Sequence, residues 1–216
     1  MNEILKTRID IDQATKWLQD NKLIKSGISA KNWEAVQVLP LLKDGDLLDM
    51  GSSGGIILET AVLMGIKGRK VGIDLAYPKS VTTDTLELIH GDLMDCPIED
   101  NSFDTVISLS VVEHQVDVNK FAKECNRLLR PGGTVIVSFD YWPEQLNTKG
   151  VWLYNLEWNI LNKEDLIVLM WEFHNIGLEL TSPFDWEVQD AVINPAYCSP
   201  VAGISYTFGI LQFIKK

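Results

Sequence analysis

The sequence predicts an α/β fold in which a mostly parallel sheet carries helices on both of its faces. Strand-like segments alternate with helical ones along the chain, and this alternation is typical of parallel sheets. Several segments are apolar along their whole length, as expected of strands that are buried on both faces. A glycine-rich turn joins the first of these strands to a helix, which is the usual opening of a ligand site in such a sheet.

Composition and charge narrow the class of protein and of partner. The 216 residues suffice for one domain with a sizeable core, and 46% apolar with 23% charged residues are ordinary values for a globular protein. The net charge of -11 argues against nucleic acid as a partner, because contacts to phosphates need clustered lysine and arginine. A small molecule is therefore the favoured partner, and no oligomeric state is predicted.

The sequence gives no sign of a membrane segment, a disulfide framework or a metal site. Its three cysteines are scattered without C-x-x-C spacing, so neither a disulfide framework nor a zinc site is indicated. Asp140 with Glu113 is the alternative for a metal site, but nothing in the spacing requires one. The N-terminal segment lacks the apolar core of a signal peptide, and no apolar run approaches about 18 residues. We therefore expect a soluble, cytoplasmic protein.

Residues 1–45 are predicted to form two helices that cap the domain of residues 46–216. In the first helix, apolar residues recur at helical spacing, and Asp10 or Asp12 is positioned to cap its N-terminus. In the second helix, an apolar stripe ends at Pro40. Core packing against the sheet would explain both stripes, and so would a lid over a bound ligand.

The segment Asp46–Gly55 is the centre of the predicted site, because a strand ends there in a turn rich in small residues. Its glycines allow close approach of the backbone, and the following helix offers free N–H groups to an anionic group. A G-x-G-x-x-G motif would need glycine at Ser53, and no lysine follows as in a P-loop. An ordinary strand–helix turn is the alternative. The pattern Asp-x-Gly-x-Gly-x-Gly fails only at Ser53 and is otherwise met by Asp49, Gly51 and Gly55.

Further segments place polar residues where later strands end. The second strand ends at Asp74, where a carboxylate can accept both hydroxyls of a ribose; a helix N-cap or loop aspartate is the alternative. The third strand leads into Gly-Asp-Leu, then a Pro-apolar pair and an Asp-Asn-Ser-Phe-Asp segment. The fourth strand, over residues 105–112, is followed by Glu113 and His114. A Leu-Arg-Pro-Gly-Gly turn precedes the fifth strand.

In this order, these segments resemble those of class I S-adenosylmethionine-dependent methyltransferases of the small-molecule type. The resemblance is close from Asp49 to Phe139 and elsewhere concerns the fold only. It implies a Rossmann-like sheet of seven strands with an antiparallel last strand beside the fifth, and S-adenosyl-L-methionine as the cofactor. Asp92 would accept the adenine amino group, and the Leu93 N–H would serve a ring nitrogen. The implied cofactor contacts are Asp49, Gly51, Ser53, Gly55, Asp74, Leu75, Asp92, Leu93 and Ser110.

Glu113, His114 and Asp140 are the candidate catalytic residues, because they follow strands at the carboxyl edge, where ligands bind in open α/β sheets. Methyl transfer requires a nucleophile held in line with the methyl group, and a base assists when the acceptor is a hydroxyl. His114 is the preferred base, since an unperturbed imidazole titrates near neutrality. A histidine that only orients the strand exit fits equally well.

The methyl acceptor is the least determined part of the prediction. Aromatic residues after the fifth strand favour a flat or sugar-like molecule, because aromatic faces stack on rings. We expect O-methylation of a small metabolite or glycan precursor. One alternative is a catalytically degenerate scaffold that binds S-adenosylmethionine, which the serine at position 53 keeps open. A weaker alternative is an enzyme that uses the same fold for a different nucleoside, such as an aminopropyl transferase.

The C-terminal part is predicted to hold a helix over residues 163–174, capped by Asn162, and strands near 179–188 and 206–214. A loop of substrate-facing character, residues 194–200, lies between these strands. The apolar face expected of the helix consists of Leu166, Ile167, Met170 and Trp171.

Overall fold

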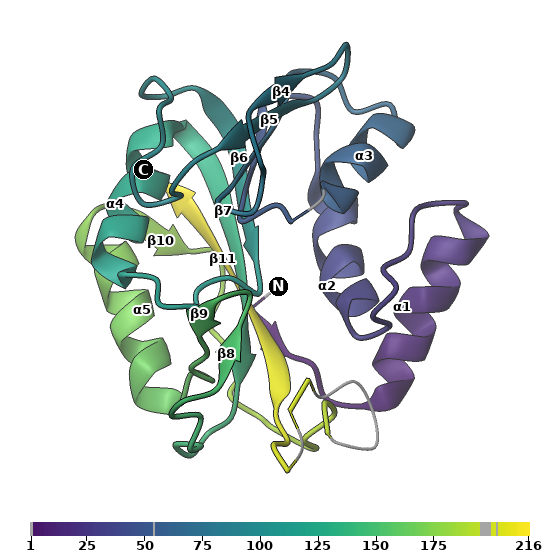
Figure 1. Ribbon diagram of the computed structural model, residues 1–216, viewed down its shortest axis with the longest axis vertical. Helices are drawn as coiled ribbons and strands as arrows, with labels where there is room; N and C mark the ends of the chain where they lie inside the picture. The colour runs from purple at the N-terminus through teal and green to yellow at the C-terminus, as the bar shows by residue number, and fades with distance from the viewer. Residues whose placement is uncertain (1, 54, 195–199, 202) are drawn as a thin grey trace.

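A parallel sheet forms the centre of the computed structural model, which describes residues 2–53, 55–194, 200–201 and 203–216 (Figure 1). Its main strands are β2 (Leu47–Met50), β3 (Lys70–Asp74), β5 (Glu87–His90), β6 (Phe103–Leu109), β7 (Leu129–Tyr141) and β11 (Thr207–Lys215). The order across the sheet is β5, β3, β2, β6, β7 and β11, and only β11 runs antiparallel to its neighbour among these six. The predicted fold class and the antiparallel last strand beside the fifth are therefore confirmed.

Helices cover both faces of this sheet (Figure 1). One face carries α1 (Arg8–Asp20), α2 (Lys31–Val38) and α3 (Ile56–Leu63), and the other carries α4 (Val118–Leu128) and α5 (Lys163–Asn175). In the described part of the chain, no helix is long and apolar enough to cross a membrane.

The core has two halves, one on each side of the sheet. In β6, Val106 belongs to the half beneath α4 and α5, whereas Ile107 belongs to the half beneath α1, α2 and α3. Ile136 of β7 faces the same side as Ile107, and its two valine neighbours face the other side. Because successive side chains of a strand point to opposite faces, a strand buried on both faces must be apolar throughout.

Three short strands at the edges bring the sheet to nine strands, two more than predicted. β1 (Glu3–Ile4) and β10 (Leu178–Leu180) share the outer edge of β11, and β4 (Val81–Thr82) pairs with β5. The strand predicted over 179–188 is therefore much shorter than expected. The edge of β11 ahead of it is occupied by β1, and Asn2 closes the gap between the two short strands by accepting the N–H of Gln212 at 2.6 Å.

The N-terminal helix begins at a different cap from the one predicted. Thr7, not Asp10 or Asp12, is the N-cap of α1: its hydroxyl accepts the Asp10 N–H at 3.4 Å. The Asp10 carboxylate accepts the Thr7 N–H in return at 2.8 Å. This reciprocal arrangement is a capping box, in which the acidic residue belongs at the third helical position. After α2, a short 3-10 turn over Leu39–Leu41 contains the predicted helix-ending proline.

Helix α5 keeps its predicted cap, but its buried face is rotated from the predicted one. Asn162 accepts the Asp165 N–H at 3.0 Å, which confirms the cap. Ile167 and Trp171 are 48% and 61% exposed, so their assignment to the apolar face was wrong. The helix has more apolar residues than one stripe needs, and the spacing i, i+3, i+7 decides which of them face the sheet. The fully buried residues are Leu166, Leu169 and Phe173.

We expect Leu169→Ala to lower the free energy of unfolding by about 2–5 kcal/mol, because it leaves a cavity in the core. Ile167→Ala removes a similar side chain from the exposed side of the same helix and should change it by less than about 1 kcal/mol. Urea unfolding of the two variants measures both values. Equal losses would show that the helix buries a different face from the one described.

Candidate active site

The turn between β2 and α3 has a backbone that small residues allow. Gly51 has a φ of +82°, and a Cβ at this position would lie 2.5 Å from Cγ2 of Val111. Ser53, at the position of the missing glycine, has a φ of +31°. Gly55 precedes α3 with a φ of +73°, and no side chain within the described residues caps this helix. The N–H groups of its first turn are therefore left for another acceptor.

Asp74 ties this turn to the end of β3. Its Oδ2 accepts the Ser53 N–H at 2.8 Å, and its Oδ1 accepts the Ala76 N–H at 2.7 Å. The contact to Ser53 uses a backbone group, so a serine makes it as well as a glycine does. Leu75 follows Asp74 and is 56% exposed. The structure thus brings the predicted glycine turn and the predicted ribose residue together.

Asp49 lies beneath the turn rather than on its surface. Its side chain is buried, and burial together with the nearby Asp74 charge raises its pKa to about 8. Asp49 is therefore mostly protonated, and so uncharged, at neutral pH.

Asp92 and Leu93 lie at the end of β5, the neighbour of β3 in the sheet. One Asp92 carboxylate oxygen accepts the Met94 N–H at 2.8 Å, which fixes the turn that follows. Its other oxygen has no hydrogen bond to any residue that the structure describes. Asp74 and His90 are paired across β3 and β5, so the predicted ribose and adenine residues lie on adjacent strand ends.

A cluster of buried charges occupies the ends of β6 and β7 and includes two residues of α2. Glu34 of α2 accepts the Ser110 hydroxyl at 2.6 Å and also the Ser138 hydroxyl. Its other oxygen lies 3.2 Å from Nζ of Lys31. Burial would lower the pKa of Lys31, but the charges of Glu34, Asp140 and Glu113 hold it above its ordinary value. Ser110, predicted to contact the cofactor, is thus turned toward α2.

Asp140 and Glu113 are buried carboxyl groups with unused oxygens. Oδ2 of Asp140 accepts the indole N–H of Trp158 at 2.7 Å, whereas Oδ1 of Asp140 and both oxygens of Glu113 have no hydrogen-bond partner among the described residues. Burial raises the pKa of Asp140 to about 6. Burial and the Asp140 charge raise the pKa of Glu113 well above its ordinary value. With a pKa of about 6, Asp140 is mostly ionised at neutral pH.

His114 lies beside this cluster but is a weak base. Burial, with the nearby Lys31 charge, lowers its pKa to about 4, so its ring is neutral at pH 7. Its Nδ1 has no partner within the described chain, and the ring meets the edge of Tyr154 at 5.5 Å between centroids. The pKa of Asp140, about 6, is nearer to neutrality than the pKa of His114, about 4. The role of each remains a prediction.

A cavity of about 500 Å³, most of whose lining residues are polar, adjoins the cluster. It lies between the segment after His114 and the hairpin of β8 (Trp152–Leu153) and β9 (Leu156–Glu157). Trp152 and the turn residue Tyr154, expected to stack on a ligand, are 59% and 76% exposed and do not line it. The loop predicted to face a substrate, 194–200, falls mostly outside the described residues. The lining consists of Gln115, Gln145, Leu146, Asn147, Thr148, Lys149, Glu157, Trp158 and Asn159.

Sequence reasoning missed Lys31 and Glu34, whereas Trp158, one of the aromatic residues expected at the acceptor pocket, does line the cavity. The two α2 residues are three apart in a helix and would be taken for an ordinary surface ion pair. Glu34 meets Ser138 across a separation of 104 residues, so no local pattern signals the contact. A charged pair within an otherwise apolar stripe was the only available hint.

Comparison with known proteins agrees with this geometry. A family model described as "Methyltransferase domain" matches residues 48–137. Over these residues the chain is similar to the methyltransferase domains of class I S-adenosylmethionine-dependent enzymes. The matched part of the methyltransferase domain includes Asp49, Asp74 and Asp92, whereas Lys31 and Asp140 lie outside it.

Curated relatives match the methyltransferase domain over part of their length. One is a Mycolicibacterium smegmatis protein named as a probable S-adenosylmethionine-dependent methyltransferase, 31% identical over 103 residues, which are 43% of this chain and 37% of that protein. Another is a Staphylococcus aureus demethylmenaquinone methyltransferase, 35% identical over 77 residues, which are 36% of this chain and 32% of that protein. The matches thus span about a third of the length of these relatives.

Solved structures resemble the methyltransferase domain in fold. Geranyl diphosphate C-methyltransferase from Streptomyces coelicolor has a TM-score of 0.63 at 16% identity, over 85% of this chain and 78% of that chain. Phosphoethanolamine N-methyltransferase 2 from Haemonchus contortus has a TM-score of 0.59 at 18% identity, over 94% of this chain and 56% of that chain. At these identities the likeness shows the fold alone.

Asp74→Ala should weaken the binding of S-adenosylhomocysteine by about 1–3 kcal/mol, the cost of losing a hydrogen-bond acceptor for a buried ligand group. The variant also removes the acceptor of the Ser53 N–H hydrogen bond. Asp84→Ala is the matched control, because it removes an exposed acidic residue from the same region. Calorimetric titration of both variants decides the matter, and unchanged affinity in Asp74→Ala would remove the ribose assignment.

Lys31→Met should lower the free energy of unfolding by about 3 kcal/mol, because it leaves buried carboxylates without their cation. The double variant Lys31→Met with Glu34→Gln should recover part of this loss. Lys16→Met, which breaks an exposed pair with Asp20, should cost less than about 1 kcal/mol. Urea unfolding at pH 7 compares the three proteins. A Lys31 variant as stable as the Lys16 variant would contradict the buried-charge description.

Proposed function

We propose that this protein transfers the methyl group of S-adenosylmethionine to a hydroxyl group of a small polar acceptor, such as a metabolite or glycan precursor. One observation carries the proposal. Asp140 is a buried carboxyl group with a pKa near 6, and its Oδ1 has no hydrogen-bond partner among the described residues. Its Oδ2 accepts a hydrogen bond from Trp158, which lines the cavity. This arrangement offers a proton acceptor next to a space for a hydroxylated molecule.

The cofactor fits the other half of the site. Gly51 has a positive φ and no room for a side chain, so the backbone of the turn would face the ligand. The first turn of α3 has N–H groups free for an anionic group. Asp74 would hold the ribose hydroxyls, and the free oxygen of Asp92 would accept the adenine amino group. When bound, S-adenosylmethionine supplies a methyl group on a positively charged sulfur.

The residues of this chain then have two tasks, to orient the acceptor and to remove its proton. Much of the rate of a direct displacement can come from orientation alone. Asp140 is ionised at neutral pH and can take the hydroxyl proton through Oδ1, while Trp158 holds Oδ2. His114, with its pKa near 4, orients groups through a neutral ring rather than acting as the base. Lys31 and Glu34, from the predicted cap of residues 1–45, hold the cluster in place.

The cavity lining supports a hydroxylated acceptor over a flat aromatic one. Four of the nine residues that line it have side-chain amides, and an amide whose hydrogen bonds are not already made can both donate to and accept from a hydroxyl group. The side chains of Gln115 and Asn159 have no hydrogen bond within the described residues and are free to bind a ligand. Lys149 and Glu157 contribute one charge of each sign, so the lining favours no net charge on the acceptor.

The test is methyl transfer from S-adenosylmethionine labelled in its methyl group to a panel of monosaccharides, polyols and catechols. Asp140→Asn should lower turnover by about a hundredfold or more, the typical contribution of a general base. The unmodified protein should gain activity as pH rises through about 6, the Asp140 pKa, and this rise should vanish in Asp140→Asn. His114→Gln should keep the rise.

Two outcomes would contradict the proposal. Binding of S-adenosylhomocysteine without transfer to any member of the panel would favour the scaffold alternative. A pH profile lost in His114→Gln and kept in Asp140→Asn would assign the base to His114.

A further inference from the structure

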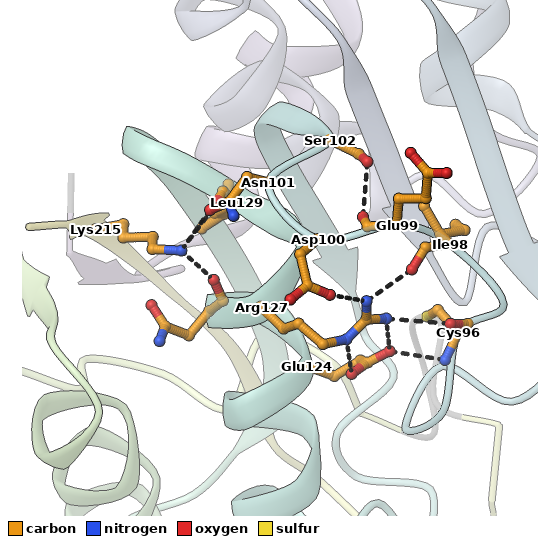
Figure 2. A network of polar contacts seen from close by, with 11 residues as sticks. Cys96, Ile98, Glu99, Asp100, Asn101, Ser102, Glu124, Arg127, Leu129 and Lys215 are labelled. Atoms are coloured by element: carbon orange, nitrogen blue, oxygen red, sulfur yellow. Dashed lines mark hydrogen bonds and ion pairs between the residues drawn. The ribbon is translucent and has the colours of Figure 1, made fainter.

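Arg127, near the C-terminal end of α4, holds the loop that leads from β5 to β6. Figure 2 shows its guanidinium group among the loop residues, with Glu124 beneath it. Nη1 donates to the Ile98 carbonyl and to Asp100 Oδ1, each at 2.7 Å. Nη2 donates to the Cys96 carbonyl at 3.1 Å.

Glu124 completes the arrangement around this guanidinium. Its two oxygens accept Nε and Nη2 of Arg127 at 2.9 and 2.6 Å. The five N–H donors of the guanidinium thus have five contacts, the most that an arginine can satisfy. Glu124 also accepts the Cys96 N–H at 2.8 Å, so both backbone groups of Cys96 are held by the pair.

The held residue lies one turn from the predicted adenine contacts. The Cys96 thiol donates to the Leu93 carbonyl at 3.5 Å, and the Asp95 N–H donates to the Asp92 carbonyl at 3.1 Å. The Asp92 carboxylate itself accepts the Met94 N–H. Residues 92–96 therefore form one hydrogen-bonded turn whose far end is fixed by Arg127 and Glu124.

The pair remains charged over the working pH range. Burial would raise the pKa of Glu124, but hydrogen bonds from Arg127 and from the Cys96 N–H hold it below its ordinary value. The opposite end of the loop is anchored separately, because the Asn101 N–H donates to the Arg127 carbonyl at 2.9 Å. Lys215 donates to the Asn126 and Leu129 carbonyls at 2.6 and 2.7 Å and supports the end of α4.

We propose that Arg127, acting through Glu124 and Cys96, is a positioning residue that sets Asp92 and Leu93 for recognition of the adenine amino group. The inference rests on the proposed function, since it assumes that adenine binds at this turn. Arg127 contacts the loop on the side of α4 and is not itself a ligand. Its role is to fix the position of the Asp92 carboxylate oxygen that has no hydrogen bond within the described residues and that would accept the adenine amino group.

The experiment compares S-adenosylhomocysteine with S-inosylhomocysteine, in which a carbonyl replaces the adenine amino group. The unmodified protein should prefer S-adenosylhomocysteine, because a carboxylate attracts an amino group and repels a carbonyl oxygen. Arg127→Met removes all five donors and keeps the aliphatic stem. We expect it to bind S-adenosylhomocysteine about tenfold more weakly, the effect of one lost hydrogen bond to a charged group, and to lose most of the preference.

Two further variants separate positioning from general stability. Asp100→Asn removes the charge of a 66% exposed partner but leaves the Cys96 and Ile98 contacts, so it should keep the preference. Arg127→Lys keeps the charge but not the planar fork, and should lose part of the preference. If Arg127→Met does not fold, judged by circular dichroism, Arg127→Lys carries the test.

The outcomes distinguish this inference from the proposed function. Binding to the unmodified protein with an unchanged preference in the folded Arg127 variants would overturn the positioning role alone. No binding of S-adenosylhomocysteine to the unmodified protein would overturn the proposed function and this inference with it.

Discussion

One half-buried cation, Lys31, lies among the buried carboxyl groups at the carboxyl edge of this sheet. Lys31 is surrounded by the carboxyl groups of Glu34, Glu113 and Asp140, each of which is at least nine-tenths buried. Removing charges from water is costly, and the cost is recovered only where charges pair and their hydrogen bonds are made. Glu34 meets this condition through Lys31 and two serines, whereas Glu113 and Asp140 do not. Glu113 and Asp140 are therefore the groups that indicate a catalytic rather than a stabilising role.

This constraint links the two ends of the proposed site. At the cofactor end, the backbone of the glycine turn and the carboxylates of Asp74 and Asp92 would supply the contacts, and Asp49 is mostly protonated beneath them. At the acceptor end, Lys31 keeps enough positive charge near Asp140 for that group to ionise below neutrality. Helix α2 supplies the cation to both its own Glu34 and the strand ends, so the N-terminal segment contacts the proposed acceptor end.

The sequence predicted features that depend on neighbouring residues. The glycine turn, the acidic ends of β3 and β5 and the Asn162 cap were all found because each is encoded within a few positions. The cap of α1 was missed, because Thr7 and Asp10 exchange hydrogen bonds and only the acidic partner was considered. Ile167 and Trp171 were misplaced because α5 has apolar residues on more than one side.

Features that depend on contacts far apart in the chain were beyond local patterns. Glu34 meets Ser138, and Trp158 meets Asp140, only after the sheet has formed. The low pKa of His114 follows from burial and from Lys31, neither of which its sequence neighbours reveal. For the same reason the sequence favours His114 as the base, whereas we propose Asp140, whose pKa of about 6 is nearer to neutrality than the value of about 4 for His114. The short β10 likewise reflects competition with β1 for one sheet edge.

The most direct measurement is a calorimetric titration of the unmodified protein with S-adenosylhomocysteine at neutral pH. It tests the central claim, a nucleoside site at the ends of β2, β3 and β5, without knowledge of the acceptor. We predict binding of one molecule per chain with a dissociation constant in the micromolar range. No binding at millimolar ligand would contradict the account, because the turn, Asp74 and Asp92 would then have no ligand to hold.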